Sequence, residues 1–203
     1  MTATRSGPGR PAQISRERIL DAAMSAGNLD TLTMRDLAAR LDVTHGALYR
    51  WVRNRDELFD LISDLLVDRV LPEDAPTART WRAWLARLGW AMHDHFLAVP
   101  GYASHLSRPH RHHAESFHRL KTAIAGAFAL AGTEPEPTEG TGPEGAEFAE
   151  LAEQSYYIFL TSLVSWLAVQ EAPLALGEHA PRFELFLDSL LRGLPAREPG
   201  VSK

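Results

Sequence analysis

The fold is decided by residues 33–58, TMRDLAARLDVTHGALYRWVRNRDEL, which can be scored position by position as two short helices joined by a tight turn. Thr33 and, three residues later, Asp36 form a capping-box start for the first helix, in which each side chain bonds the backbone of the other residue. The apolar positions of this helix recur on one face: Leu37, Ala38 and Leu41. The first helix is therefore expected to bury that face.

The second helix follows a turn at Asp42-Val43 and is expected from His45 to about Val52, with Thr44 as its N-cap. Two short helices around a tight turn are the unit that lays its second helix in the major groove of DNA. The expected DNA-binding residues are the N-cap Thr44, the base-edge residues Arg35, His45, Gly46 and Ala47, and the phosphate-reaching donors Tyr49, Arg50, Trp51, Arg53 and Arg55.

These residues resemble the signature of the TetR family of bacterial transcriptional repressors. The similarity is close from residue 15 to about residue 65, and includes a first helix at Ser15–Asn28 and the pair Leu48-Tyr49. Two positions depart from the commoner family residues: Val52 stands where Phe is usual, and Arg55 where Lys is usual. The resemblance implies that Arg55 preserves a phosphate contact, and that the chain is a homodimer whose last two helices pair with their twofold mates.

Length and composition bound the remaining possibilities. A chain of 203 residues, 45% of them hydrophobic, can build one small DNA-binding domain and a larger core. Cysteine is absent from the sequence, which excludes disulfides, thiolate metal sites and a cysteine nucleophile. The opening MTATRSGPGRPAQ has no apolar segment of the secretory kind, and no apolar run is long enough to span a bilayer. A cytoplasmic protein without membrane contact is expected.

Charge is distributed unevenly along the chain, whose formal net charge is −5. Up to Arg55 there are nine arginines and five acidic residues, a balance of +4, whereas the remainder carries −9. The basic N-terminal part is therefore attracted to DNA, and the acidic remainder of the chain is repelled by it. Residues 1–14 are rich in Gly, Pro and Arg, and are expected to be a flexible arm; Arg5 and Arg10 either follow the DNA or belong to a solvated tail.

Periodicity predicts an all-α fold of about nine helices, because no strand-like alternation is present in the sequence. The expected parts are the basic arm at 1–14, a three-helix helix-turn-helix domain at 15–71, a ligand-binding and dimerisation domain at 72–195, and a tail at 196–203. The later helices are expected at 54–71, 77–99, a short segment ending at Arg108, 112–131, 146–171 and 179–194, with a mobile loop at 132–145.

The body is expected to hold a dimer interface and a ligand pocket. Its last two helices are apolar around most of their girth, which a second subunit would cover: Phe159, Leu163, Trp166, Phe183, Phe186, Leu187 and Leu190. Its aromatic side chains with a few polar tips favour a pocket for a small apolar or aromatic ligand: Trp81, Trp84, Leu88, Met92, His95, Phe96, His105, Phe117, His118, Phe128, Tyr156 and Phe159.

The nine histidines raise the alternative of a metal site, because five lie close together: His105, His110, His112, His113 and His118. No two of these are four residues apart on one helical face, so neither a metal nor a cofactor is expected. The spacing Gly101 to His105-Leu106 is similar to that of tetracycline-binding members of the family, in which the histidine helps to hold a drug–magnesium complex.

No enzyme motif is found in the sequence, neither a Gly-rich phosphate loop nor a nucleophile elbow. The expected function is therefore a transcriptional repressor that a small ligand releases from a palindromic operator. Two alternatives stay open at this point: a metal-responsive regulator that uses the histidine cluster, and a DNA-binding protein that responds to no ligand.

Overall fold

The computed structural model describes residues 14–108, 115–132, 143–171 and 182–195, without the side chains of 143–148. Almost all of the basic arm, the tail, most of the loop at 132–145 and the histidines at 110, 112 and 113 lie outside these residues. Every regular element of the described residues is helical, which confirms the all-α prediction. The helices are α1 (Arg16–Met24), α2 (Met34–Arg40), α3 (His45–Leu48), α4 (Arg55–Val70), α5 (Trp81–Leu97), α6 (Tyr102–Leu106), α7 (Glu115–Ala129), α8 (Pro143–Glu171) and α9 (Phe183–Gly193), with a 3-10 turn at Leu130–Gly132.

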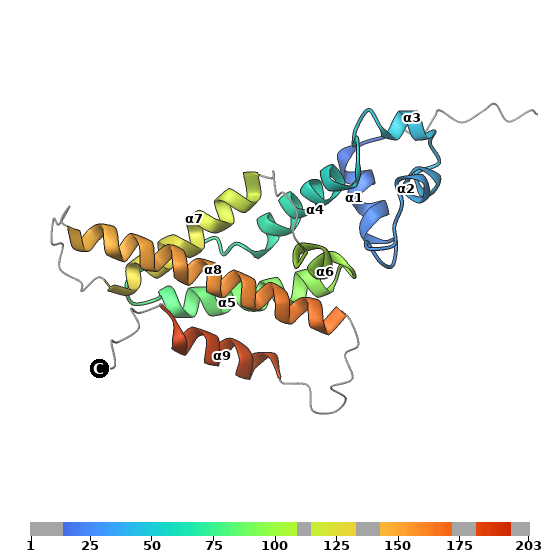
Figure 1. Ribbon diagram of the computed structural model, residues 1–203. Coiled ribbons are helices and arrows are strands. Elements are labelled where there is room, and N and C mark those ends of the chain that lie inside the picture. The colour runs from blue at the N-terminus through green and yellow to red at the C-terminus, as the bar shows by residue number, and fades with distance from the viewer. Residues whose placement is uncertain (1–13, 109–114, 133–142, 172–181, 196–203) are drawn as a thin grey trace, which may run out of the picture.

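The described helices form a small head and a larger body (Figure 1). Helices α1, α2 and α3 make the head at one end of the molecule, and α4 runs from the head into the body. Helix α5 is the centre of the body, where it packs against α4, α6, α7, α8 and α9. Because α4 contacts both α5 and α7, this helix belongs to the body as much as to the head. None of the described helices combines the length and apolar content that a membrane span requires.

The helix-turn-helix forms through local capping, as predicted. The Asp36 N–H donates to the Thr33 hydroxyl at 3.1 Å, and the Thr33 N–H donates to the Asp36 carboxylate at 3.2 Å. The hydrogen bond from the Thr33 side chain lowers the pKa of Asp36 below its ordinary value. At the other end of α2, Asp42 takes the left-handed conformation at φ 54°, and the Val43 N–H reaches back to the Ala38 carbonyl. This C-cap makes the sharp turn between α2 and α3.

The second helix of the motif is shorter than expected, because α3 ends at Leu48 instead of about Val52. The Trp51 N–H bonds the Leu48 carbonyl three residues back, at 2.8 Å, so the chain tightens into a turn. This turn carries Val52 into the core, where it is fully buried beside the next helix.

Helix α8 is longer than expected. It starts at Pro143, three residues before the expected Ala146, and proline is a residue type favoured in the first turn of a helix.

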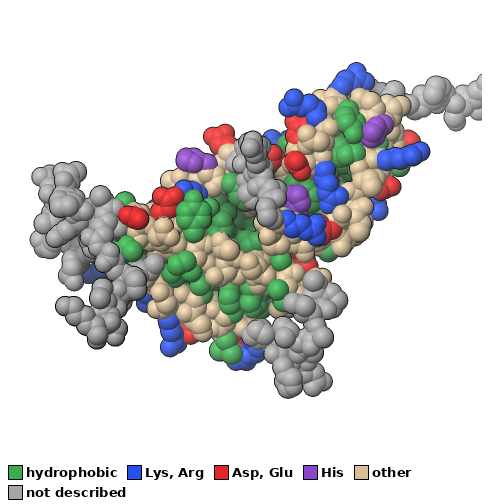
Figure 2. All heavy atoms as spheres, in the orientation of Figure 1, with side chains coloured by type: hydrophobic (Ala, Val, Ile, Leu, Met, Phe, Trp, Pro, Cys, Tyr) green, Lys and Arg blue, Asp and Glu red, His purple; other side chains and the backbone are tan. Residues whose placement is uncertain are grey.

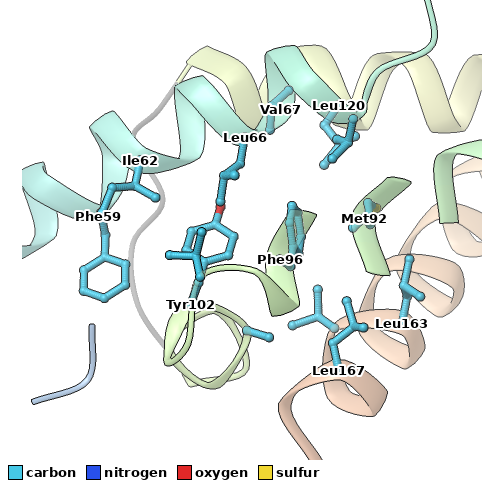
Figure 3. Packing of buried hydrophobic residues seen from close by; sticks show 14 of the residues in the cluster. Phe59, Ile62, Leu66, Val67, Met92, Phe96, Tyr102, Leu120, Leu163 and Leu167 are labelled. Carbon is cyan, nitrogen blue, oxygen red and sulfur yellow. The ribbon is translucent and has the colours of Figure 1, made fainter. Parts of the chain in front are cut away.

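The core of the body lies between α4, α5 and α8. In Figure 3, Met92 and Phe96 of α5 stand between Leu66 of α4 on one side and Leu163 and Leu167 of α8 on the other. All five side chains are at most 1% exposed. Helix α5 therefore covers apolar side chains of α8, such as Leu163, that the sequence pattern assigns to contact with a partner subunit.

This packing corrects the predicted dimer interface. Four of its members are buried inside the single chain: Phe159, Leu163, Phe183 and Leu187. Leu187 packs against α5 so closely that a Cβ added at Gly89 would lie 2.8 Å from its Cδ1 atom. The other three members are only partly buried: Trp166, Phe186 and Leu190. Three further apolar side chains of α8 and α9 are well exposed: Tyr157, Ile158 and Leu185.

Candidate functional site

The head presents α3 and the turn that follows it to solvent. Tyr49 is 40% exposed and Trp51 is 49% exposed, unusual values for aromatic side chains of a folded chain. The His45 and Tyr49 rings lie 4.4 Å apart, between centroids, at 60°. Figure 2 shows basic side chains around this end of the molecule, and all of them are arginines, because the head contains no lysine. The surface combines flat rings and cations, the chemistry that contacts sugars and phosphates of DNA.

The N-terminal end of α3 is small and open. A Cβ added at Gly46 would meet no atom within 4 Å, so packing within the described chain does not require a glycine there. The neighbouring Thr44 hydroxyl accepts the Ala47 N–H at 3.2 Å, which confirms the predicted N-cap. Thr44 is thus committed to the helix, while Gly46 leaves space for a molecule that approaches from outside.

The arginines of the head divide into exposed and engaged groups. Arg35 and Arg50 are exposed and form no ion pair with another described residue. The Arg53 guanidinium pairs with Glu57 at 3.3 Å but remains 81% exposed, so leaving this partner costs little. The Arg53 backbone N–H also donates to the Glu57 carboxylate at 2.6 Å, and this bond is the main reason why the pKa of Glu57 is lowered.

Arg55 faces inward. Its guanidinium donates to the carbonyl oxygens of Leu32 and Leu29, at 2.9 and 2.6 Å, and lies 3.7 Å from an Asp30 carboxylate oxygen. The same group stands 5.2 Å above the centroid of the Phe59 ring. The side chain thus fastens α4 to the segment between α1 and α2, a role that sequence spacing does not reveal, and the phosphate contact expected of Arg55 stays a prediction.

The head touches the body through a close backbone contact. The Leu29 N–H donates to the Pro100 carbonyl oxygen at 2.7 Å, and Arg108 reaches the Asp30 carboxylate with two bonds of 3.2 and 2.8 Å. Gly101 has φ +89°, and a Cβ added there would lie 2.4 Å from the Asn28 side-chain oxygen. No other residue type fits at this corner.

The carboxylate of Glu171, at the end of α8, caps the first turn of α6. It accepts the N–H groups of Gly101, Ala103 and Ser104, at 3.0, 3.3 and 2.8 Å. A negative charge at a helix N-terminus satisfies donors that lack a partner within the helix and opposes the positive end of the helix dipole. No local sequence pattern indicates this role of Glu171, because its partners lie about 70 positions earlier in the chain.

The other side of α6 packs on α4. The rings of His105 and Phe59 are stacked with centroids 3.5 Å apart, and the Tyr102 hydroxyl bonds the Ser63 hydroxyl at 2.9 Å. Burial raises the pKa of the Tyr102 phenol, which stays protonated. His105 is thus a packing residue between α4 and α6, and not the cavity residue that was expected.

A cavity of about 410 Å³ lies between α6, α7 and α8. Its lining residues are Phe96, Leu106, Ser107, Phe117, His118, Leu120, Lys121, Tyr156, Tyr157, Leu160, Thr161, Val164 and Ser165. Four of the predicted ligand residues are among them: Phe96, Phe117, His118 and Tyr156. The volume and mostly apolar walls are those of a small-molecule site.

The other eight predicted ligand residues do not line this cavity: Trp81, Trp84, Leu88, Met92, His95, His105, Phe128 and Phe159. Leu88, Met92 and Phe159 are fully buried in the core, and the Trp84 indole N–H donates to the Asp74 carbonyl at 2.7 Å. Periodicity identifies such side chains as buried but not which of them border an empty space. Lys121 and the serine and threonine side chains of the lining were missed, since they sit at polar positions of the pattern.

The histidine cluster is not assembled among the residues that the structure describes. There, no group of three or more His, Cys, Asp or Glu side chains is placed to hold a metal ion. The prediction concerning the histidines at 110, 112 and 113 lies outside the described residues.

No protein-family model matches the chain, and no curated protein matches its sequence. Solved structures do match it. A possible TetR family transcriptional regulator from Streptomyces coelicolor A3(2) is 24% identical, with 90% of this chain and 99% of that chain covered and a TM-score of 0.67. The fold is that of the TetR family of regulators.

Two further structures of this fold carry bound molecules. The Streptomyces coelicolor TetR family protein ActR, in complex with actinorhodin, is 22% identical over 90% of this chain and 95% of that chain, with a TM-score of 0.67. BioQ with its natural double-stranded DNA operator is 21% identical over 89% and 99%, with a TM-score of 0.59. The TetR-type fold thus covers both the head and the body of this chain.

The inward position of Arg55 predicts a stability effect. Arg55→Met should lower the free energy of unfolding by about 1–3 kcal/mol, because two carbonyl oxygens lose a charged donor in a partly buried place. Arg53→Met, at an exposed neighbouring position, should change the free energy of unfolding by no more than about 0.5 kcal/mol. Urea denaturation of the two variants measures both values, and equal losses would contradict the inward role.

Proposed function

We propose that this chain is a ligand-responsive transcriptional regulator: a homodimer that represses transcription from a palindromic operator and is released by a small apolar or aromatic ligand. The observation that carries the proposal is the exposed α3, with its open N-terminus and flanking cations, on a head that is joined to a body containing a cavity. The BioQ structure with its operator and the ActR structure with actinorhodin support the two halves of the proposal.

In the DNA complex, α3 enters the major groove by its N-terminus. His45, Gly46 and Ala47 approach the base edges, since a glycine with open space around it permits close contact with the backbone. Tyr49 and Arg50 reach phosphates on either side of the groove, and Arg53 joins them by leaving its exposed pair with Glu57. A palindromic site then requires two heads held about one helical turn of DNA apart.

The second head comes from a second copy of the chain, paired through α8 and α9. The buried members of the expected interface belong to the core, so the contact is made by side chains that one chain leaves uncovered. These side chains are the exposed Ile158 and Leu185, together with the partly buried Trp166, Phe186 and Leu190.

Helix α6 couples the cavity to the head. Leu106 and Ser107, at its C-terminal end, border the cavity. At its N-terminal end, Gly101 adjoins Pro100, whose carbonyl holds the Leu29 N–H of the head. A ligand that prefers one placement of α6 therefore shifts the head between two placements, and DNA must weaken ligand binding by the same factor.

The DNA proposal is tested with duplexes selected from a randomised pool, and with binding followed by fluorescence anisotropy. Arg50→Ala should lower affinity for every duplex by roughly tenfold, because a charged phosphate contact is lost. His45→Ala should instead change which sequence is preferred. Arg79→Ala, on the exposed segment before α5, is the control and should change neither. Failure of the pool to yield any preferred sequence would refute DNA recognition.

The dimer proposal predicts different effects for the same substitution at two leucines of α9. Leu185→Arg should give a folded monomer, because it puts a charge into the contact between copies without touching the core. Leu187→Arg should unfold the body, because that side chain is packed against Gly89. Sedimentation gives the oligomeric state and circular dichroism the fold. A dimer that persists in the Leu185 variant would place the interface elsewhere.

The coupling proposal is tested at Glu171. Glu171→Gln keeps the shape of the side chain but removes the charge that holds three N–H groups, so amide hydrogen exchange should become faster at Ala103 and Ser104. If α6 positions the head, exchange at Leu29 should become faster as well. Glu150→Gln, exposed on the same α8, should leave Leu29 unchanged. An effect that stops at α6 would rule out this route.

A further inference from the structure

We propose that the cavity between α6, α7 and α8 binds a flat aromatic molecule that carries an anionic group, a carboxylate or an acidic phenolate, and that Lys121 binds this group. The inference rests on the proposed function, since it names the class of ligand for the same site. It makes Lys121 a residue that determines specificity.

The cavity walls select flat, apolar molecules. Phe96, Phe117 and Tyr156 contribute aromatic rings from three different helices, and Leu106, Leu120 and Leu160 fill the spaces between them. Aromatic walls favour ligands whose rings can stack or meet them edge to face. The volume of about 410 Å³ has room for a molecule of two or three fused rings.

The formally charged side chain within the lining is positive. Lys121 is the one lysine or arginine among the lining residues, and none of them is Asp or Glu. The remaining polar groups include the hydroxyls of Thr161 and Tyr157, which can donate hydrogen bonds to an oxygen, whereas the Ser107 hydroxyl already donates to the Ser104 carbonyl at 2.9 Å. Burial raises the pKa of the Tyr156 phenol, so this wall adds no negative charge. Among the lining side chains, an anion therefore meets one positive charge and no carboxylate, since Glu153 lies outside the lining.

The Lys121 ammonium is held in place before any ligand arrives. It lies 2.5 Å from a Glu153 carboxylate oxygen, 3.4 Å from the Tyr157 hydroxyl, and 5.8 and 5.2 Å from the ring centroids of Tyr156 and Tyr157. The hydrogen bond to Glu153 is the main cause that raises the pKa of Lys121, which keeps the ammonium charged. A fixed cation loses little freedom when it binds an anion.

Glu153 already forms with Lys121 the ion pair that the anionic group of a ligand would form. Its carboxylate pairs with Lys121 from α8 but does not line the cavity, so the ammonium is shared between the cavity and its edge. A bound carboxylate competes with Glu153 for Lys121. Because the pair joins α7 to α8, a ligand that takes over the ammonium also weakens a tie between the two helices that enclose it.

The test compares two probes, anthracene-2-carboxylate and its neutral carboxamide, by isothermal titration calorimetry with the full chain. The carboxylate should bind about tenfold more tightly, the effect of one charge-assisted contact at a partly exposed site. Lys121→Met should abolish this preference by weakening the carboxylate alone, and Lys121→Arg should retain it. Glu153→Gln should strengthen carboxylate binding, because the internal competitor is removed. Arg119→Met, a cation of α7 that pairs with Asp68 instead of lining the cavity, is the control and should preserve the preference.

Equal binding of the two probes, or a loss in Lys121→Met that affects both alike, would overturn recognition of an anion by Lys121. Absence of binding by both would overturn the proposed ligand class altogether. Neither result touches the DNA proposal, whose failure would appear separately, as the lack of a preferred duplex for the same protein preparation. The thermal unfolding midpoint of each variant verifies that the α7–α8 pair remains folded.

Discussion

The placement of the head depends on a backbone contact that admits no side chain. The Leu29 N–H reaches the Pro100 carbonyl at 2.7 Å, and the next residue, Gly101, has φ +89° with the Asn28 side chain where a Cβ would be. Around this contact, Arg55 adds bonds from α4 to the carbonyls of Leu29 and Leu32. The segment between α1 and α2 is thus held from two directions, by the corner before α6 and by the start of α4. Both α4 and the corner before α6 therefore contact the head through this one segment.

Helix α6 is well suited to this position because it has little stability of its own. A helix of five residues is far too short to persist alone, so its place is set by its neighbours. Glu171 of α8 holds its N-terminal N–H groups, Phe59 of α4 stacks on its His105, and its last residue borders the cavity. Helix α4, helix α8 and the cavity therefore all adjoin α6, a helix whose own sequence does not determine its position. Such an element adapts to its surroundings, a property that the proposed coupling between the cavity and the head requires.

The sequence predicted the features that depend on neighbours within a few positions. The Thr33–Asp36 box and the Thr44 cap were found from spacing alone, because both partners lie in one turn of chain. Features that join distant segments were missed or misassigned. Arg55 has partners 23 and 26 positions away, and Glu171 about 70. Apolar periodicity likewise indicated that Leu187 is buried, but not that α5 buries it instead of a second subunit.

One carboxylate at this junction serves two arginines. Asp30 receives two bonds from Arg108 and lies 3.7 Å from Arg55, so the head is fastened in part by charge. Ionic strength weakens such pairs where solvent reaches them, as it does at Arg108. Binding of a protein to DNA also weakens as salt rises, because counterions condense again on the phosphates when the protein dissociates. For the DNA binding proposed above, salt would therefore act at two places, and a salt titration would report the state of this junction together with the phosphate contacts.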